Sequence, residues 1–183
     1  MINTMILLIV IVFLLPCIGT SRATLCPLVF AQKDFNITEY AGLWCEAYRH
    51  DANEVDTKCK NGTYTVNSNG TMDVLSEGLN KLTGYYSNQG SAIPKRLSEP
   101  AAFLIHDKNP TKTVKYNIIQ TNYQQYSLIY SCDYVPIIGI RFEHIWFLSR
   151  NKTFPEPILD EFKKVLKHIH VESSGIESTP QDW

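Results

Sequence analysis

The stretch EYAGLWCEAYRHD, Glu39 to Asp51, decides the fold because it places a tryptophan directly before a cysteine on a segment with the character of a β-strand. Successive side chains on a strand point to opposite faces, so Trp44 and Cys45 cannot both face the interior. If Trp44 faces in, Cys45 faces out. The orientation of this indole therefore bears directly on whether the neighbouring thiol has a structural role, such as a disulfide, or a catalytic one.

Most of the chain after this stretch has the pattern of short strands separated by turn signals. Asn69-Gly70 lies between two alternating runs and is a strong signal for a tight hairpin. Links of hairpin length favour an antiparallel up-and-down barrel over a sandwich. We predict an all-β fold of eight strands, the seven beyond the opening stretch lying near Tyr64–Val66, Met72–Ser76, 82–92, 99–107, 113–123, 124–135 and 140–150.

One α-helix is predicted after the last strand, where Pro155 and Pro157 precede a run of helical periodicity. Its lysines, Lys163, Lys164 and Lys167, fall largely on the opposite side from the apolar residues. We expect this helix to pack its apolar stripe on the outside of the barrel wall. The residues of that stripe are Ile158, Leu159, Phe162, Val165, Leu166 and Ile169.

The first 23 residues are typical of a secretory signal peptide. The apolar block Ile6–Leu15 is shorter than the roughly 20 residues of a transmembrane helix, and Ser21 and Ala23 are spaced like a cleavage site. We expect a secreted, extracellular protein with one domain over 24–171 and a loose, patternless tail over 172–183. The near-neutral charge offers no basic stripe for nucleic acid.

The cysteine count of the secreted chain is even once Cys17 leaves with the signal peptide, which predicts two disulfides. The four cysteines are Cys26, Cys45, Cys59 and Cys132. Four sequons for N-glycosylation also favour secretion. Their asparagines are Asn36, Asn61, Asn69 and Asn151.

Three motifs carry a resemblance to a known family. Gly42-x-Trp44 resembles the first lipocalin motif, TNYQQYS from Thr121 to Ser127 the second, and the segment with Arg150 the third. The order and spacing resemble those of the lipocalins from about Cys26 to Val171. Within the family, GSAIPKRLSEPAAF and YSLIYSCDYV resemble the branch of apolipoprotein D, Lazarillo and the insect bilin-binding proteins.

The resemblance implies roles for the motif residues and a disulfide pattern. Trp44 would plug the closed end of the barrel, with the guanidinium of Arg150 stacked over it. Cys26 would pair with Cys132. The partner that Cys59 has in this branch, a C-terminal cysteine, is missing here, which leaves Cys45 as the expected partner. Asn122 also replaces the aspartate usual in the second motif.

An eight-stranded barrel can hold one small ligand in its interior. Strand alternation places Tyr64, Val66 and Val74 inside, and the resemblance adds Phe103, Ile105, Tyr116, Ile118, Phe142 and Trp146. The alternative interpretation is that these side chains simply fill a core. An apolar, aromatic lining with two phenols and little charge fits a lipid, retinoid, sterol or bilin.

The segment Val135–Ile140 joins the last two strands at the expected open mouth and is almost entirely apolar. Either Ile138 and Ile140 tuck into the entrance, or the loop contacts a lipid surface or a receptor. The sequons at Asn69 and Asn151 are expected at the closed end, and Asn61 is expected to face outward from the wall.

We predict a carrier rather than an enzyme, with no cofactor and no metal site. The first alternative is an extracellular protein-binding glycoprotein that uses the barrel as a scaffold. The second is a pocket-thiol isomerase, which needs an inward cysteine of low pKa. Cys45 and Cys59 are both expected to face outward. His168 and His170 lie too far apart around the helix to bind one metal ion.

Overall fold

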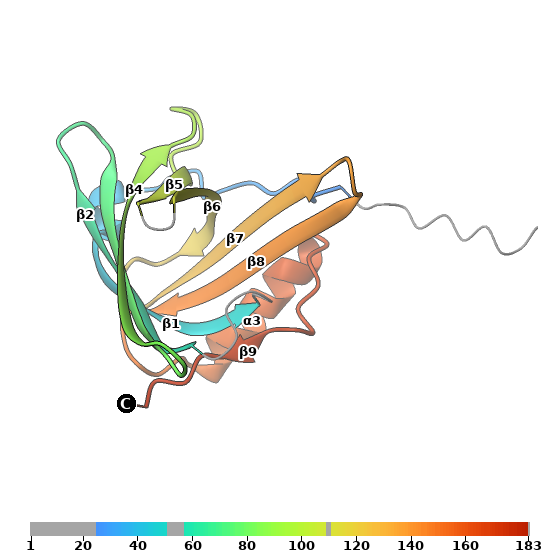
Figure 1. The fold of residues 1–183 in the computed structure, drawn as a ribbon. Helices are drawn as coiled ribbons and strands as arrows, with labels where there is room; N and C mark the ends of the chain where they lie inside the picture. The colour runs from blue at the N-terminus through green and yellow to red at the C-terminus, as the bar shows by residue number, and fades with distance from the viewer. Residues whose placement is uncertain (1–24, 51–56, 109–110, 183) are drawn as a thin grey trace, which may run out of the picture.

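The computed structural model describes residues 25–50, 57–108 and 111–182, so the predicted signal peptide lies outside the described residues. Neighbouring strands are antiparallel throughout, and β1 pairs with both β8 and β2, which closes the barrel (Figure 1). The predicted eight-stranded up-and-down barrel is confirmed. Its strands are β1 (Gly42–His50), β2 (Thr57–Val66), β3 (Met72–Asn80), β4 (Gly84–Pro94), β5 (Ala102–Lys108), β6 (Thr111–Thr121), β7 (Tyr126–Val135) and β8 (Ile140–Ser149).

The predicted helix is α3 (Glu156–His168), which lies beside β7 and β8 on the outside of the barrel (Figure 1). Its buried residues Leu159, Phe162 and Leu166 belong to a core cluster with side chains from the outer face of the barrel, including Leu128 and Phe147. None of the helices within the described ranges is long and apolar enough to cross a membrane. The apolar stripe of α3 is thus explained by packing on the wall.

The closed end of the barrel is sealed by the short helix α2 (Ile37–Tyr40) and by Trp44. The Asn36 side chain caps α2 by accepting hydrogen bonds from the Thr38 and Glu39 amides. Trp44 is fully buried, and its Nε1 donates to the Tyr40 carbonyl oxygen at 2.9 Å. The first strand therefore starts from a plug that is both apolar and hydrogen-bonded.

Arg150 lies over this plug, as the resemblance implied. Its guanidinium carbon is 3.7 Å from the centre of the Trp44 ring, a cation–π geometry. Gly42 leaves room for it, because a Cβ there would lie 3.3 Å from Arg150 and the backbone φ of +99° suits glycine. Arg150 also donates hydrogen bonds to the carbonyl oxygens of Glu39, Tyr40, Ala41, Leu43 and Tyr123.

The C-terminal tail is packed, so the expectation of a loose tail is wrong. Its two-residue strand β9 (Glu177–Ser178) pairs with β1, and the Thr179 amide donates to the Ala47 carbonyl oxygen at 2.8 Å. β1 pairs with β2 only over Gly42–Cys45, so β2 does not cover the rest of this edge of β1, and the tail pairs there instead. Backbone hydrogen bonds hold the tail there, and such bonds leave no side-chain pattern in a sequence.

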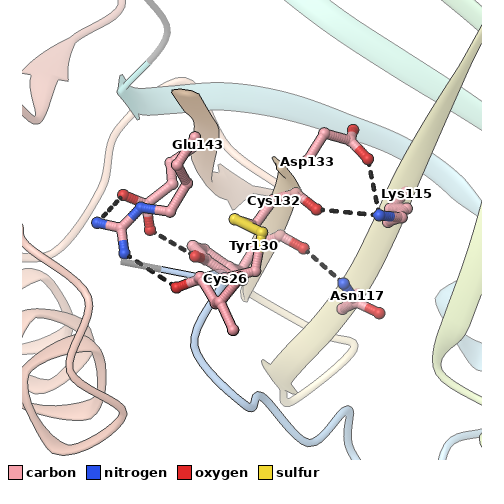
Figure 2. Close-up of a disulfide and its surroundings, with 9 residues drawn as sticks. Cys26, Lys115, Asn117, Tyr130, Cys132, Asp133 and Glu143 are labelled. Atoms are coloured by element: carbon pink, nitrogen blue, oxygen red, sulfur yellow. Dashed lines mark hydrogen bonds and ion pairs between the residues drawn. A yellow bond between two sulfur atoms is a disulfide. The ribbon is translucent and has the colours of Figure 1, made fainter. Parts of the chain in front are cut away.

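The disulfide between Cys26 and Cys132 is confirmed, and it ties the N-terminal segment to β7 (Figure 2). An ion pair of 2.7 Å between Lys115 and Asp133 lies beside it. The loop closed by this bond spans 106 residues, so its loss would destabilise the fold by about 4 to 5 kcal/mol on the chain-entropy account.

The expectation of a Cys45–Cys59 disulfide is wrong: both cysteines are free thiols. Cys45 lies opposite Asn61 in the strand register, so Cys59 is displaced two residues along β2. The register also shifts there, where Cys59 has a φ of +52°. The Cys59 Sγ donates instead to the Asp182 carbonyl oxygen at 3.3 Å.

Replacing Arg150 with lysine tests the clasp at the closed end. The lysine keeps the charge but cannot reach the several carbonyl oxygens that the planar guanidinium serves. We expect the free energy of unfolding to fall by about 2 kcal/mol, measured by urea denaturation. The exposed neighbour Lys152→Ala is the control and should leave it nearly unchanged. Equal stability of Arg150→Lys and the native protein would contradict this account.

Candidate functional site

A cavity of about 160 Å³ lies inside the barrel, above the packed closed end. The wall around it is mixed, with aromatic and aliphatic side chains beside charged and polar ones. Its residues are Trp44, Glu46, Lys60, Asn61, Gly62, Tyr64, Val74, Ser76, Tyr86, Asn88, Ile105, Asp107, Lys112, Val114, Tyr116, Trp146 and Leu148. The barrel is therefore not packed solid.

Five of the nine predicted lining residues border this cavity: Tyr64, Val74, Ile105, Tyr116 and Trp146. The other four do not. Phe103 and Ile118 are fully buried in the core at the closed end, and Val66 packs against the same core. Phe142 lies at the open end of β8 and is 43% exposed. Strand alternation predicts the face of a residue but not its depth along the barrel axis.

Tyr64 and Tyr116 supply the buried hydroxyl groups of the aromatic wall, and the buried Tyr40 packs on Tyr64 with ring centres 5.4 Å apart. The hydroxyl groups of Tyr64 and Tyr116 share a hydrogen bond of 2.7 Å, and Tyr116 stacks on Trp146 with ring centres 6.0 Å apart. Burial raises the pKa of Tyr40 to about 12 and raises those of Tyr64 and Tyr116 as well. Like any tyrosine, these phenols are neutral at physiological pH and can both donate and accept hydrogen bonds, and burial keeps them neutral to a higher pH.

The cavity also carries charge, contrary to the expected lining. Glu46 is only 3% exposed, and its carboxylate pairs with Lys60 at 3.3 Å and Arg49 at 3.2 Å. Asp107 and Lys112 face each other across β5 and β6 nearer the open end. Strand alternation predicts this inward orientation. Glu46 lies two residues after the inward Trp44, and Lys60 lies four residues before the inward Tyr64, so each shares its neighbour's face of the strand.

Residues 50–182 match the family model described as the lipocalin / cytosolic fatty-acid binding protein family. This chain belongs to the lipocalin family. Apolipoprotein D of Bos taurus is 26% identical over 156 residues, covering 85% of this chain and 82% of the bovine protein. The Lazarillo protein of Schistocerca americana is 26% identical over 154 residues, covering 82% of this chain and 72% of that protein. These similarities agree with the predicted branch.

Solved lipocalin structures share the fold. Insecticyanin from the tobacco hornworm Manduca sexta superposes with a TM-score of 0.75 at 21% identity, covering 87% of this chain and 86% of its own. Lobster apocrustacyanin A1 superposes with a TM-score of 0.72 at 20% identity, covering 86% and 91%. At these identities the likeness supports the fold alone.

The two free thiols of this lipocalin do not border the cavity. Cys45 is half-buried, and burial raises its pKa, the opposite of what a nucleophilic thiol requires. Cys59 is buried under the tail. Within the described ranges, no group of three or more His, Cys, Asp or Glu side chains is placed to hold a metal ion.

The four sequons differ in accessibility. Asn69 and Asn151 are exposed, at the β2–β3 turn and just after β8. Asn36 is exposed, but its side chain is engaged as the cap of α2 and also donates to Glu39. Asn61 is half-buried, and its Oδ1 has no hydrogen-bond partner. Glycosylation thus stays a prediction, favoured at Asn69 and Asn151.

The stability of this lipocalin should fall at alkaline pH because of its buried phenols. An unfolded tyrosine ionises near pH 10, whereas Tyr40 in the fold ionises near pH 12. Its contribution is therefore fully present below pH 10 and is lost as the pH rises from 10 to 12. For Tyr40 this amounts to about 2 to 3 kcal/mol. Urea denaturation at pH 8 and pH 11.5 measures it.

The control for that experiment is Tyr40→Phe, which removes one ionising group but keeps the ring. The variant should lose less stability between the two pH values than the native protein does. Its remaining loss comes from Tyr64 and Tyr116, whose pKa values are raised in the same direction. An identical pH dependence in both proteins would show that Tyr40 is not the group responsible.

Proposed function

We propose that this lipocalin is a secreted carrier that binds one small hydrophobic or amphipathic ligand in its barrel without chemistry. The observation that carries the proposal is the cavity walled by Trp44, Trp146 and the hydrogen-bonded Tyr64–Tyr116 pair. Apolar and aromatic walls with few polar groups are typical of small-molecule sites. The name of the matching family, which includes fatty-acid binding, and the apolipoprotein and insecticyanin relatives support the same class of function.

The dimensions of the site favour a compact ligand. The closed end is filled by core side chains, so only the part of the barrel nearer the mouth is available. The cavity volume is about ten times that needed for one water molecule. A lipid, retinoid, sterol or bilin could place its apolar body between the aromatic walls. Its polar group could then meet the phenols or the Glu46–Lys60 pair.

Secretion is supported by the chemistry of the described residues. The Cys26–Cys132 disulfide persists in oxidising compartments, and exposed sequons are found at Asn69 and Asn151. The signal-like segment at residues 1–23 favours the same destination. A carrier is favoured over a pocket-thiol isomerase because Cys45 and Cys59 lie outside the cavity lining.

Truncation of the aromatic wall tests ligand binding. Trp146→Ala should weaken the binding of retinol by about tenfold or more, since it removes a large stacking surface. Fluorescence titration measures this affinity. Because Trp44 also borders the cavity, the part of the ligand-dependent quenching that is lost in Trp146→Ala reports contact with Trp146. Tyr116→Ala should weaken binding similarly while secretion continues.

The matched control for Trp146→Ala is Phe142→Ala on the same strand and face, outside the cavity lining. It should bind retinol like the native protein. If Trp146→Ala and Tyr116→Ala both bind a ligand with native affinity, the site is not this cavity. If neither retinol nor a fatty acid, a sterol or a bilin binds the native protein, the carrier function is wrong.

A second activity is favoured by the β7–β8 turn, the segment Val135–Ile140. Ile137 is 95% exposed, Ile138 59% and Ile140 46%, so these side chains do not tuck into the entrance. Exposed neighbouring isoleucines at a loop tip are typical of a contact surface. We propose that this turn, at the open end of the barrel, touches a lipid surface during ligand exchange.

Ile137→Asp tests this contact by placing a charge where an apolar side chain would enter the lipid. We expect co-sedimentation with phosphatidylcholine vesicles to fall by about fivefold or more. Leu97→Asp is the control, since Leu97 is 100% exposed in the loop before β5. An equal loss of vesicle binding in both variants would contradict a lipid contact at this turn. The absence of vesicle binding by the native protein would contradict it too, and would leave a receptor or no partner at the turn.

A further inference from the structure

The barrel wall is incomplete between β1 and β2. The two strands are paired only near the closed end, where Gly42–Cys45 lies opposite Tyr64–Asn61. Towards the open end, β1 continues to His50 and β2 begins at Thr57, and in the described residues the backbones of these parts are not paired with each other. Side chains join them instead, because Arg49 donates hydrogen bonds to the hydroxyl and the carbonyl oxygen of Thr57. The backbone edges on either side of this gap need hydrogen-bond partners.

The C-terminal segment 177–182, called here the terminal strap, fills this gap. On one side, its Thr179 amide donates to the Ala47 carbonyl oxygen of β1 at 2.8 Å. On the other side, the Cys59 amide of β2 donates to the Pro180 carbonyl oxygen at 2.8 Å. The terminal strap therefore bridges β1 and β2 as an extra strand.

The terminal strap also holds the charged wall of the cavity. Thr179 Oγ1 donates to the Glu46 carboxylate at 2.8 Å, and Gln181 Nε2 donates to the Glu46 carbonyl oxygen at 2.8 Å. Glu46 and its ion-pair partner Lys60 both line the cavity. The strap thus lies directly behind the part of the wall that borders the ligand site.

The terminal strap is held by contacts that can break together. Its paired strand β9 has only two residues, and both are exposed. Its ion pair, Lys58 with Asp182, is 3.9 Å long with the Asp182 side chain 80% exposed, a type of pair that adds little stability. The Cys59 thiol is free and contributes one hydrogen bond, which it donates to the Asp182 carbonyl oxygen at 3.3 Å.

We propose that the terminal strap is a side gate of the cavity, whose release from β1 and β2 opens a lateral path for the ligand. The proposal rests on the carrier function proposed above. Release of the strap uncovers the unpaired edges of both strands and frees the Glu46 carboxylate from Thr179. Once the Glu46–Lys60 ion pair separates as well, water and ligand can pass beside Lys60, without passing the mouth between the loops. Return of the strap closes the wall behind the ligand.

The Cys59 thiol provides a direct probe of the gate. Cys59 is 4% exposed and lies under the terminal strap, so it should react with iodoacetamide only when the strap is released. A Cys45→Ser background leaves Cys59 as the free thiol to be labelled. Stopped-flow fluorescence then measures retinol dissociation from the same secreted proteins, which lack Cys17 once the predicted signal peptide is removed.

Thr179→Pro removes two hydrogen bonds, the one from the Thr179 amide to Ala47 and the one from the Thr179 hydroxyl to Glu46. Thr179→Val removes only the hydrogen bond from the hydroxyl. We expect Thr179→Pro to accelerate both Cys59 alkylation and retinol dissociation by about fivefold or more, the size expected when one or two hydrogen bonds are lost. Thr179→Val should have a smaller effect on both rates. The control is Ser178→Ala, because Ser178 is exposed in the same strand.

Faster alkylation with unchanged retinol dissociation in Thr179→Pro would overturn the gate. Unchanged alkylation in both Thr179 variants would also overturn it, because the strap would then not be held by these contacts. If neither retinol nor a fatty acid, a sterol or a bilin binds the native protein, the carrier function fails instead. Cys59 alkylation would still report whether the strap opens, so the two failures are distinguishable.

Discussion

The stacking of Arg150 on Trp44 is the contact on which the rest of the structure depends. The indole fills the closed end of the barrel, and the guanidinium covers it at 3.7 Å while serving carbonyl oxygens of α2, of the first strand and of the loop before β7. The stretch from α2 into the first strand, the loop before β7 and the end of β8 lie far apart in the sequence and are thus joined at a single point. Because Trp44 is fully buried and held by this contact, the first strand enters the barrel in a defined register.

The packed closed end limits the free space inside the barrel. Core side chains, including Phe103 and Ile118, fill the barrel next to Trp44, so free space remains only further along the axis. In that space the wall combines aromatic side chains with the charged pair Glu46–Lys60. The phenols of Tyr64 and Tyr116 lie in the same wall, and burial raises their pKa values, so they stay protonated to a higher pH than an exposed tyrosine. The site therefore combines apolar surface with neutral and charged hydrogen-bonding groups.

The short register between β1 and β2 leaves a gap in the pairing of the barrel wall. Since β1 and β2 separate beyond Cys45, the barrel uses the C-terminal segment to complete its hydrogen bonding. This arrangement leaves Cys59 free and covered, and it connects the last residues of the chain to the border of the cavity. The stability of the wall and access to the site are thus joined in one segment.

The sequence by itself determined the strands, the outer helix, the motif residues and the face on which Trp44, Tyr64 and Tyr116 lie, because side-chain periodicity is a local property. Only the tertiary structure decided how deep each inward residue lies, which is why Val66, Phe103, Ile118 and Phe142 fall outside the cavity. It also decided the fate of Cys45 and Cys59, through a register shift in β2. The packing of the tail depends on backbone hydrogen bonds to distant strands, and these are independent of side-chain pattern.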